Sequence, residues 1–143
     1  MYRVTVDTNV LVSGLNYRGL PRRILDSAED GIFRLQISNA ILNEMIRILQ
    51  EKFRWSLVQA QAARQLVSTR AQHVTPHLEL NVIKEDVDDN RILECAQASH
   101  SDYLVTGDKD LLRLKQYAGT RILKPAEFVA LMQSSAPGRF LTE

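Results

Sequence analysis

The N-terminus of the chain joins a short strand-like run directly to a helix-like one. Residues 2–6 are rich in Val and Thr and end abruptly on Asp7. Asn9–Leu15 is then compatible with a helix, with almost no loop before it. A short apolar run followed by a helix is typical of a central strand in a parallel sheet. Because ligands bind beyond the carboxyl ends of such strands, Asp7 is predicted to face a functional crevice.

Strand-like and helix-like segments continue to alternate along the chain. Further strands are predicted at residues 33–37, 72–75, 103–106 and 121–123, and further helices at residues 21–30, 39–53, 57–70, 90–99, 109–114 and 125–133. This order predicts an α/β fold, a three-layer α/β/α sandwich with a central parallel sheet of about five strands. Residues 1–133 are expected to form a single domain, and residues 134–143, which carry Ser, Pro and Gly, a flexible C-terminal tail.

The composition is that of an ordinary globular protein, 45% hydrophobic and 24% charged over 143 residues. No apolar run approaches the ~18 residues of a membrane span, and the N-terminus lacks the order of a signal peptide. The single cysteine, Cys95, excludes an internal disulfide and a cysteine-rich metal site. A cytoplasmic, reducing location is therefore expected.

The net charge of +1 indicates no particular partner, but the charges are unevenly distributed. Nine acids and three bases lie between Glu79 and Asp110, whereas bases dominate residues 47–70 and 113–124. An acidic centre with basic flanks suits a protein that holds cations at one spot and a polyanion around it. Ordinary solvated helix faces of mixed sign would also give this pattern.

Acidic residues from separate segments are predicted to meet at the carboxyl edge of the sheet. Asp7 ends the first strand, and Asp108 directly follows the strand at residues 103–106. Glu44 lies about two turns into the helix after the second strand. Asp88 and Asp89 begin a helix that runs back toward the opposite edge, so they also start at the carboxyl edge. Four acidic positions therefore converge on one crevice.

Clustered carboxylates raise one another's pKa and cost stability unless a cation binds them. Ligation by oxygen alone suits Mg²⁺ or Mn²⁺, and one ion, or two ions about 3.5–4 Å apart, can promote hydrolysis of a phosphodiester. The sequence does not choose between one ion and two. Each acid also has a simpler explanation in helix capping, the helix dipole or an ion pair with Arg47; these acids are Asp7, Glu44, Asp88, Asp89, Asp108 and Asp110.

Bases and aromatic residues interleave near the end of the helix at residues 39–53, as they do on surfaces that bind single-stranded nucleic acid. Aromatic residues at a corner between helices also commonly pack against the core. The candidates for RNA contact are Arg47, Lys52, Arg54 and Trp55. No GxGxxG or P-loop is present, which argues against a nucleotide cofactor.

Four stretches together resemble the PIN-domain family, and in particular its small single-domain members from toxin–antitoxin pairs. They are Val6–Val10, the mid-helix Glu44, Asp89–Ala96 and Leu104–Leu112. The Asp-Thr-Asn sequence after an apolar strand is weak evidence alone, but its combination with Thr-Gly-Asp-Lys-Asp-Leu-Leu and with the D-x-x-I-L-x-x-A pattern of residues 89–96 is specific. The resemblance runs from about Tyr2 to Met132.

This resemblance implies a ribonuclease that depends on Mg²⁺ or Mn²⁺, on a sheet related to that of flap nucleases. Its metal-binding and catalytic acids would be Asp7, Glu44, Asp89 and Asp108, with Asn9, Thr106, Asp88 and Asp110 in support. A shift of one residue would exchange the roles of Asp88 and Asp89, and the D-x-x-I spacing favours Asp89. An RNA substrate, a cognate antitoxin protein and a homodimer are the partners that the resemblance implies.

Two other functions fit the same sequence. A PIN domain without catalysis could bind RNA or a protein. A receiver-type phosphoacceptor domain is also a small parallel α/β unit, but it needs an acceptor Asp after the third strand, where this chain has Thr75-Pro76.

Overall fold

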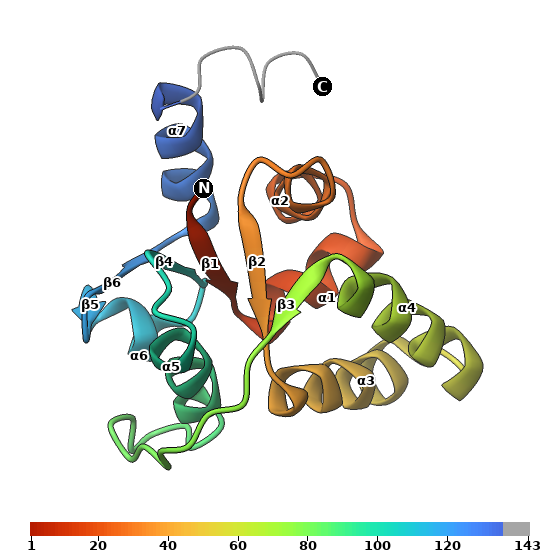
Figure 1. Ribbon diagram of the computed structural model, residues 1–143. Helices are drawn as coiled ribbons and strands as arrows, with labels where there is room; N and C mark the ends of the chain where they lie inside the picture. The colour runs from red at the N-terminus through yellow and green to blue at the C-terminus, as the bar shows by residue number, and fades with distance from the viewer. Residues whose placement is uncertain (136–143) are drawn as a thin grey trace.

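The computed structural model describes residues 1–135, which form six strands and seven helices (Figure 1). The strands are β1 (Arg3–Val6), β2 (Arg34–Ile37), β3 (Ala71–His73), β4 (Tyr103–Val105), β5 (Gln116–Tyr117) and β6 (Thr120–Leu123). The helices are α1 (Thr8–Asn16), α2 (Leu20–Glu29), α3 (Asn39–Phe53), α4 (Leu57–Thr69), α5 (Asp89–Ala98), α6 (Lys109–Leu112) and α7 (Pro125–Ser135). The predicted tail, apart from its first two residues, lies outside the described residues.

The sheet has the strand order β3-β2-β1-β4-β6-β5, and all its pairs except β5–β6 are parallel. The predicted α/β fold with a parallel sheet is therefore confirmed. The chain order reverses between β1 and β4, and ligands bind at such switch points in open α/β sheets. A receiver-type domain instead has the order 2-1-3-4-5, so the topology excludes that alternative.

The sixth strand was not predicted. β5 is two residues long and pairs antiparallel with β6 across a tight hairpin. Ala118 and Gly119 in the turn both have positive φ, 48° and 88°, which is the backbone of a type I′ hairpin turn. The usual sequence signal for that turn is Asn-Gly or Asp-Gly, and Ala-Gly does not provide it.

The two faces of the sheet are covered by different helices. Val4 pairs in register with Tyr103, and the Tyr103 ring packs on Phe128 of α7, with ring centroids 6.1 Å apart. Thr5 points to the opposite face, where its hydroxyl lies 3.8 Å from Cys95 Sγ of α5. Helix α7 also contacts α2, which in turn packs on α1. The sheet is thus the middle layer of three.

Two predicted helix starts are confirmed by their capping bonds. Ser38 accepts a hydrogen bond from the backbone N–H of Ile41 at the start of α3. Ser56 and Gln59 form the reciprocal capping box of α4, with bonds of 3.0 and 3.1 Å. Figure 1 shows α3 next to the end of β2, so its first turns lie at the carboxyl edge.

Within residues 1–135, no helix combines the length and apolarity that crossing a membrane requires.

Candidate metal centre

Asp7 and Asp108 are joined through a single hydroxyl at the switch point of the sheet. Thr106 donates its hydroxyl to Asp7 Oδ2 at 2.6 Å and accepts the backbone N–H of Asp108 at 2.9 Å. Asp7 is 4% exposed and Thr106 is fully buried. The backbone N–H of Asp7 also donates to the carbonyl of Val105 at 2.9 Å, which continues the β1–β4 ladder to the acid itself. The two predicted acids are therefore held close together.

Asp89 completes a second group of acids with Asp108. One carboxylate oxygen each from Asp86, Asp89 and Asp108 lies within 4.8 Å of the other two. Asp89 is 6% exposed, and its Oδ2 atom is buried with no hydrogen-bond partner. A buried carboxylate oxygen without a partner is costly when it is ionised, and a bound cation would satisfy it. Asp7 and Glu44 fall outside this group.

The electrostatics link all four predicted acids. Burial raises the pKa of Asp89 to about 8, and the charges of Asp108, Asp86 and Asp7 add to the rise. Burial also raises the pKa of Asp7, where the bond from Thr106 offsets part of the effect. Burial and neighbouring charges therefore destabilise the ionised form of these carboxyls, which is the form that binds a cation.

Glu44 faces the same acids from α3. Burial first, and then the negative charges of Asp88 and Asp7, raise its pKa. Arg47, one turn later, lies 4.0 Å from a Glu44 carboxylate oxygen and opposes that rise. Arg47 is closer to Glu51, at 3.2 Å. The predicted Glu44–Arg47 pair is therefore present but long, and Glu44 keeps its negative neighbours.

The supporting residues lie around these acids with different contacts. Asn9 is exposed and lines a groove of ≈ 370 Å³ together with Asp7 and Asp108. Asp110 pairs with Arg113 at 3.4 Å, while its backbone N–H donates to Asp108. Asp88 occupies the N-cap position of α5, but its side chain makes no capping bond.

Asp7 and Asp108 do cap their helices. Asp108 Oδ1 accepts the backbone N–H groups of Asp110 and Leu111, and Asp7 Oδ1 accepts that of Asn9 at 3.4 Å. Capping uses one oxygen of each carboxylate. The simpler explanation and the metal hypothesis are therefore compatible.

The predicted RNA contacts divide between the site and the far end of α3. Arg47 lies beside Glu44, whereas the exposed Lys52 and Arg54 lie about 8–11 Å beyond Arg47 along the helix axis. Trp55 is half-buried, and its indole N–H donates to Asn16 Oδ1 at 3.1 Å. Trp55 thus ties the α3–α4 corner to the end of α1, as aromatic residues at such corners commonly do.

The donor set fits a hard divalent cation. The group consists of carboxylate oxygens alone, and one of them is buried without a partner. Oxygen ligation is what Mg²⁺ and Mn²⁺ prefer. Cys95, in contrast, lies in the core, and burial raises its pKa to about 11, so it offers no reactive thiolate.

Residues 3–110 match the sequence model of the PIN domain. This chain belongs to the PIN-domain family. The matched part holds every acid described above and ends before β5, β6 and α7. Outside the matched region, β5 and β6 complete the sheet of this PIN domain, and α7 packs on one of its faces.

A solved structure shares the fold of this PIN domain. A chain in the crystal structure of VapBC2 from Rickettsia felis, bound to a DNA fragment from their promoter, superposes with a TM-score of 0.60. The two are 16% identical, and the match covers 85% of this chain and 98% of that chain. An identity this low speaks for the fold alone. Comparison with curated proteins gave no match.

Sequence reasoning missed Asp86 in this PIN domain. Asp86 lies in the long loop before α5 and is exposed, where no periodicity indicates the direction of a side chain. Its spacing from Asp89, three residues, was the available signal, because residues three apart face the same way once a helical turn forms. The backbone N–H of Asp89 does bond to the carbonyl of Asp86, at 3.1 Å.

Proposed function

We propose that this PIN-domain protein is an endoribonuclease that depends on Mg²⁺ or Mn²⁺, and that it is the toxin of a toxin–antitoxin pair. The observation that carries the proposal is the buried, unpartnered Oδ2 of Asp89 beside Asp108 and Asp86. Repulsion among these acids is unfavourable in the free protein. A bound cation would neutralise that repulsion, with these acids as its shared ligands.

Asp7, Glu44, Asp89 and Asp108 are the residues proposed to hold one or two ions. When bound, the metal supplies Lewis-acid chemistry for the hydrolysis of an RNA phosphodiester. The Thr106 hydroxyl fixes the orientation of Asp7, and Asn9 borders the groove through which substrate reaches the acids. Asp88 and Asp110 contribute negative charge at the edge of the centre.

RNA is proposed to lie from the groove along α3, where Arg47, Lys52 and Arg54 can contact its phosphates. Such contacts position a strand without reading its sequence. Trp55 is bonded to Asn16, and it is proposed to present the exposed part of its ring to a base.

The proposed partners follow from the family and the fold. The structural neighbour comes from a VapBC2 complex, and the likeness to it supports a cognate antitoxin protein for this chain. A homodimer and a cytoplasmic location belong to the same proposal. Co-expression with the protein encoded beside it, followed by purification of the pair, tests the antitoxin part.

Cleavage of single-stranded RNA by the purified protein tests the enzyme. We expect cleavage with Mn²⁺ and none with excess EDTA. Asp7→Asn should lower the rate by about 100-fold or more, since a metal supplies several kcal/mol of transition-state stabilisation. Asp26→Asn, an exposed acid paired with Arg22, is the matched control and should cleave like the wild type.

Cleavage that survives both EDTA and Asp7→Asn would refute the proposal. Binding of Mn²⁺ without cleavage of any RNA would instead indicate a PIN domain that binds RNA or protein without catalysis. Sequencing of RNA ends after induction of the wild type and of Asp7→Asn would identify the target.

A further inference from the structure

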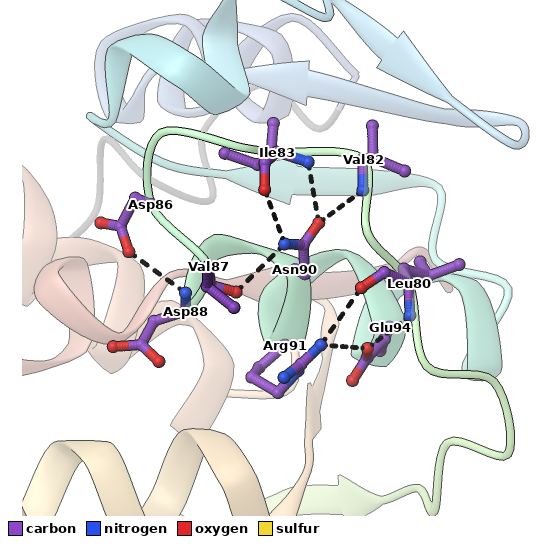
Figure 2. A network of polar contacts seen from close by, with 9 residues as sticks. All are labelled: Leu80, Val82, Ile83, Asp86, Val87, Asp88, Asn90, Arg91 and Glu94. Atoms are coloured by element: carbon purple, nitrogen blue, oxygen red, sulfur yellow. Dashed lines mark hydrogen bonds and ion pairs between the residues drawn. The ribbon is translucent and has the colours of Figure 1, made fainter.

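The segment between β3 and α5, residues 74–88, contains no helix or strand. Loops longer than about 12–15 residues without secondary structure are uncommon in compact domains, and the ordered ones are usually functional. Figure 2 shows its second half folded over the first turns of α5, held by a network of polar contacts. We call residues 82–88 the arm.

Asn90 of α5 fastens the arm along its length. Its Oδ1 accepts the backbone N–H groups of Val82 and Ile83, both at 2.9 Å. Its Nδ2 donates to the carbonyls of Ile83, at 2.8 Å, and Val87, at 3.1 Å. An Asn amide has two donors and two acceptor lone pairs, and all four are used on the arm. Asn90 is fully buried, so water does not compete for these bonds.

The fastened arm carries Asp86 to the other acids. A carboxylate oxygen of Asp86 lies within 4.8 Å of oxygens from Asp89 and Asp108. Asp86 Oδ1 also accepts the backbone N–H of Asp88 at 3.1 Å (Figure 2), which fixes the side chain. The adjacent Glu85 points instead to Arg113 of the α6 end, at 3.9 Å. Two neighbouring acids of one loop thus have different surroundings.

Bringing Asp86 to this place is unfavourable without a cation, because it adds a third negative charge beside a buried one. Asp89 is only 6% exposed, and its Oδ2 atom has no hydrogen-bond partner. A cation would stabilise this oxygen as well. The four hydrogen bonds between the buried Asn90 side chain and the arm offset this repulsion, because they hold the arm against α5.

We propose that Asp86 is a further metal-binding carboxylate of the centre, and that Asn90 is the positioning residue that holds it there. The ligand is a divalent cation of the Mg²⁺ or Mn²⁺ class. This inference rests on the metal dependence in the proposed function and adds a fifth acid, from the arm, to the four proposed above.

Calorimetric titration of the metal-free, full-length protein with Mn²⁺ tests the role of Asp86. Asp86→Asn should weaken Mn²⁺ binding by about 10-fold or more, at least the loss typical of an outer-shell partner. Glu85→Gln removes the same charge one residue away and should weaken binding by less than about fivefold, as expected of an exposed charge. Equal effects of the two substitutions would overturn the assignment.

A double-mutant cycle tests the role of Asn90. Asn90→Ala should weaken Mn²⁺ binding in the wild type but have little further effect in the Asp86→Asn background, because it acts through Asp86. Additive losses would overturn the positioning role. Circular dichroism verifies that each variant is folded; if Asn90→Ala is not, Asn90→Ser, which keeps a small polar group, takes its place in the cycle.

These results are separable from the nuclease test because no RNA is present. Mn²⁺ binding that depends on Asp86 in a protein that cleaves no RNA supports this inference and refutes the nuclease. Unchanged affinity in Asp86→Asn, in a protein whose cleavage depends on Asp7, does the reverse. A wild type that binds no Mn²⁺ overturns both.

Discussion

Thr106 shows how much of the candidate centre depends on single atoms. Its one hydroxyl donates to Asp7 and accepts from the backbone of Asp108, two acids that follow neighbouring strands. Neither bond is replaceable by water, since Thr106 is fully buried. The residue is therefore predicted to set the orientation of Asp7 toward a cation.

Removal of this hydroxyl is predicted to weaken metal binding. Thr106→Val keeps the shape of the side chain but leaves Asp7 Oδ2 and the Asp108 N–H without their shared partner. Loss of such a partner typically lowers metal affinity by about 10–100-fold, whereas Thr106→Ser should stay near the wild type. Mn²⁺ titration of both variants is the measurement, and equal affinities in both would contradict the prediction.

Asp89 gives a prediction about pH and stability. Its pKa is raised from 3.8 to about 8, chiefly by burial. A carboxyl with a higher pKa in the folded state favours folding when protonated, so its contribution falls as the pH rises between those two values. Relative to Asp89→Asn, the metal-free wild type should therefore lose stability from about pH 5 to about pH 8.

Urea unfolding of both proteins at the two pH values measures this difference. Saturating Mn²⁺ should remove it from the wild type, since a ligand that binds the folded state stabilises it. A free energy of unfolding that changes in parallel for both proteins would show that Asp89 is not the cause.

At the scale of elements, the close approach of α1 and α2 supports the position of Asp7 at the start of α1. A Cβ atom on Gly14 would lie 2.6 Å from Leu25 Cδ1 and 2.9 Å from the backbone oxygen of Pro21. Gly14→Ala must therefore push the helices apart, at a cost of about 1–3 kcal/mol. Gly107→Ala, where a Cβ would meet nothing within 4 Å, is the control for stability in urea unfolding.

The basic end of α3 gives a prediction about RNA. Lys52 and Arg54 are exposed, and each phosphate contact with a single strand contributes about 0.7 to the slope of log affinity against log salt. The Lys52→Gln/Arg54→Gln protein should therefore lose roughly 1.4 from that slope, with unchanged Mn²⁺ binding. Filter binding of RNA over a range of salt concentrations measures it, and an unaltered slope would place the RNA elsewhere.

Elements with a strong local signal could be predicted from sequence, and elements fixed by distant contacts could not. The caps Ser38 and Ser56 identify α3 and α4 because their bonds join residues three apart. β5 could not be predicted, because a strand of two residues shows no alternation of polar and apolar residues and its hairpin lacks the usual turn residues. The position of Asp86 could not be predicted for a related reason, since it depends on the tertiary hydrogen bonds between Asn90 and the arm.

At the scale of the whole molecule, the part that matches the PIN domain, residues 3–110, does not by itself contain a complete core. β6 pairs with β4, and the carbonyl of Leu123 accepts the N–H of Thr106 at 2.9 Å. Phe128 of α7 is fully buried, with its ring centroid 5.2 Å from that of Phe33. The elements after residue 114 therefore support both the sheet and the residue that orients Asp7.

A chain that ends at residue 114 is consequently predicted not to fold. Loss of one buried Phe costs about 3–5 kcal/mol, and a domain has a total stability of only about 5–15 kcal/mol. This truncation removes Phe128 together with a strand that pairs with β4. A chain that ends at residue 135 keeps both and should unfold cooperatively on heating, as followed by circular dichroism. A sharp transition in the shorter chain would mean that residues 3–110 carry the core alone, and that β6 and α7 are accessory to the centre.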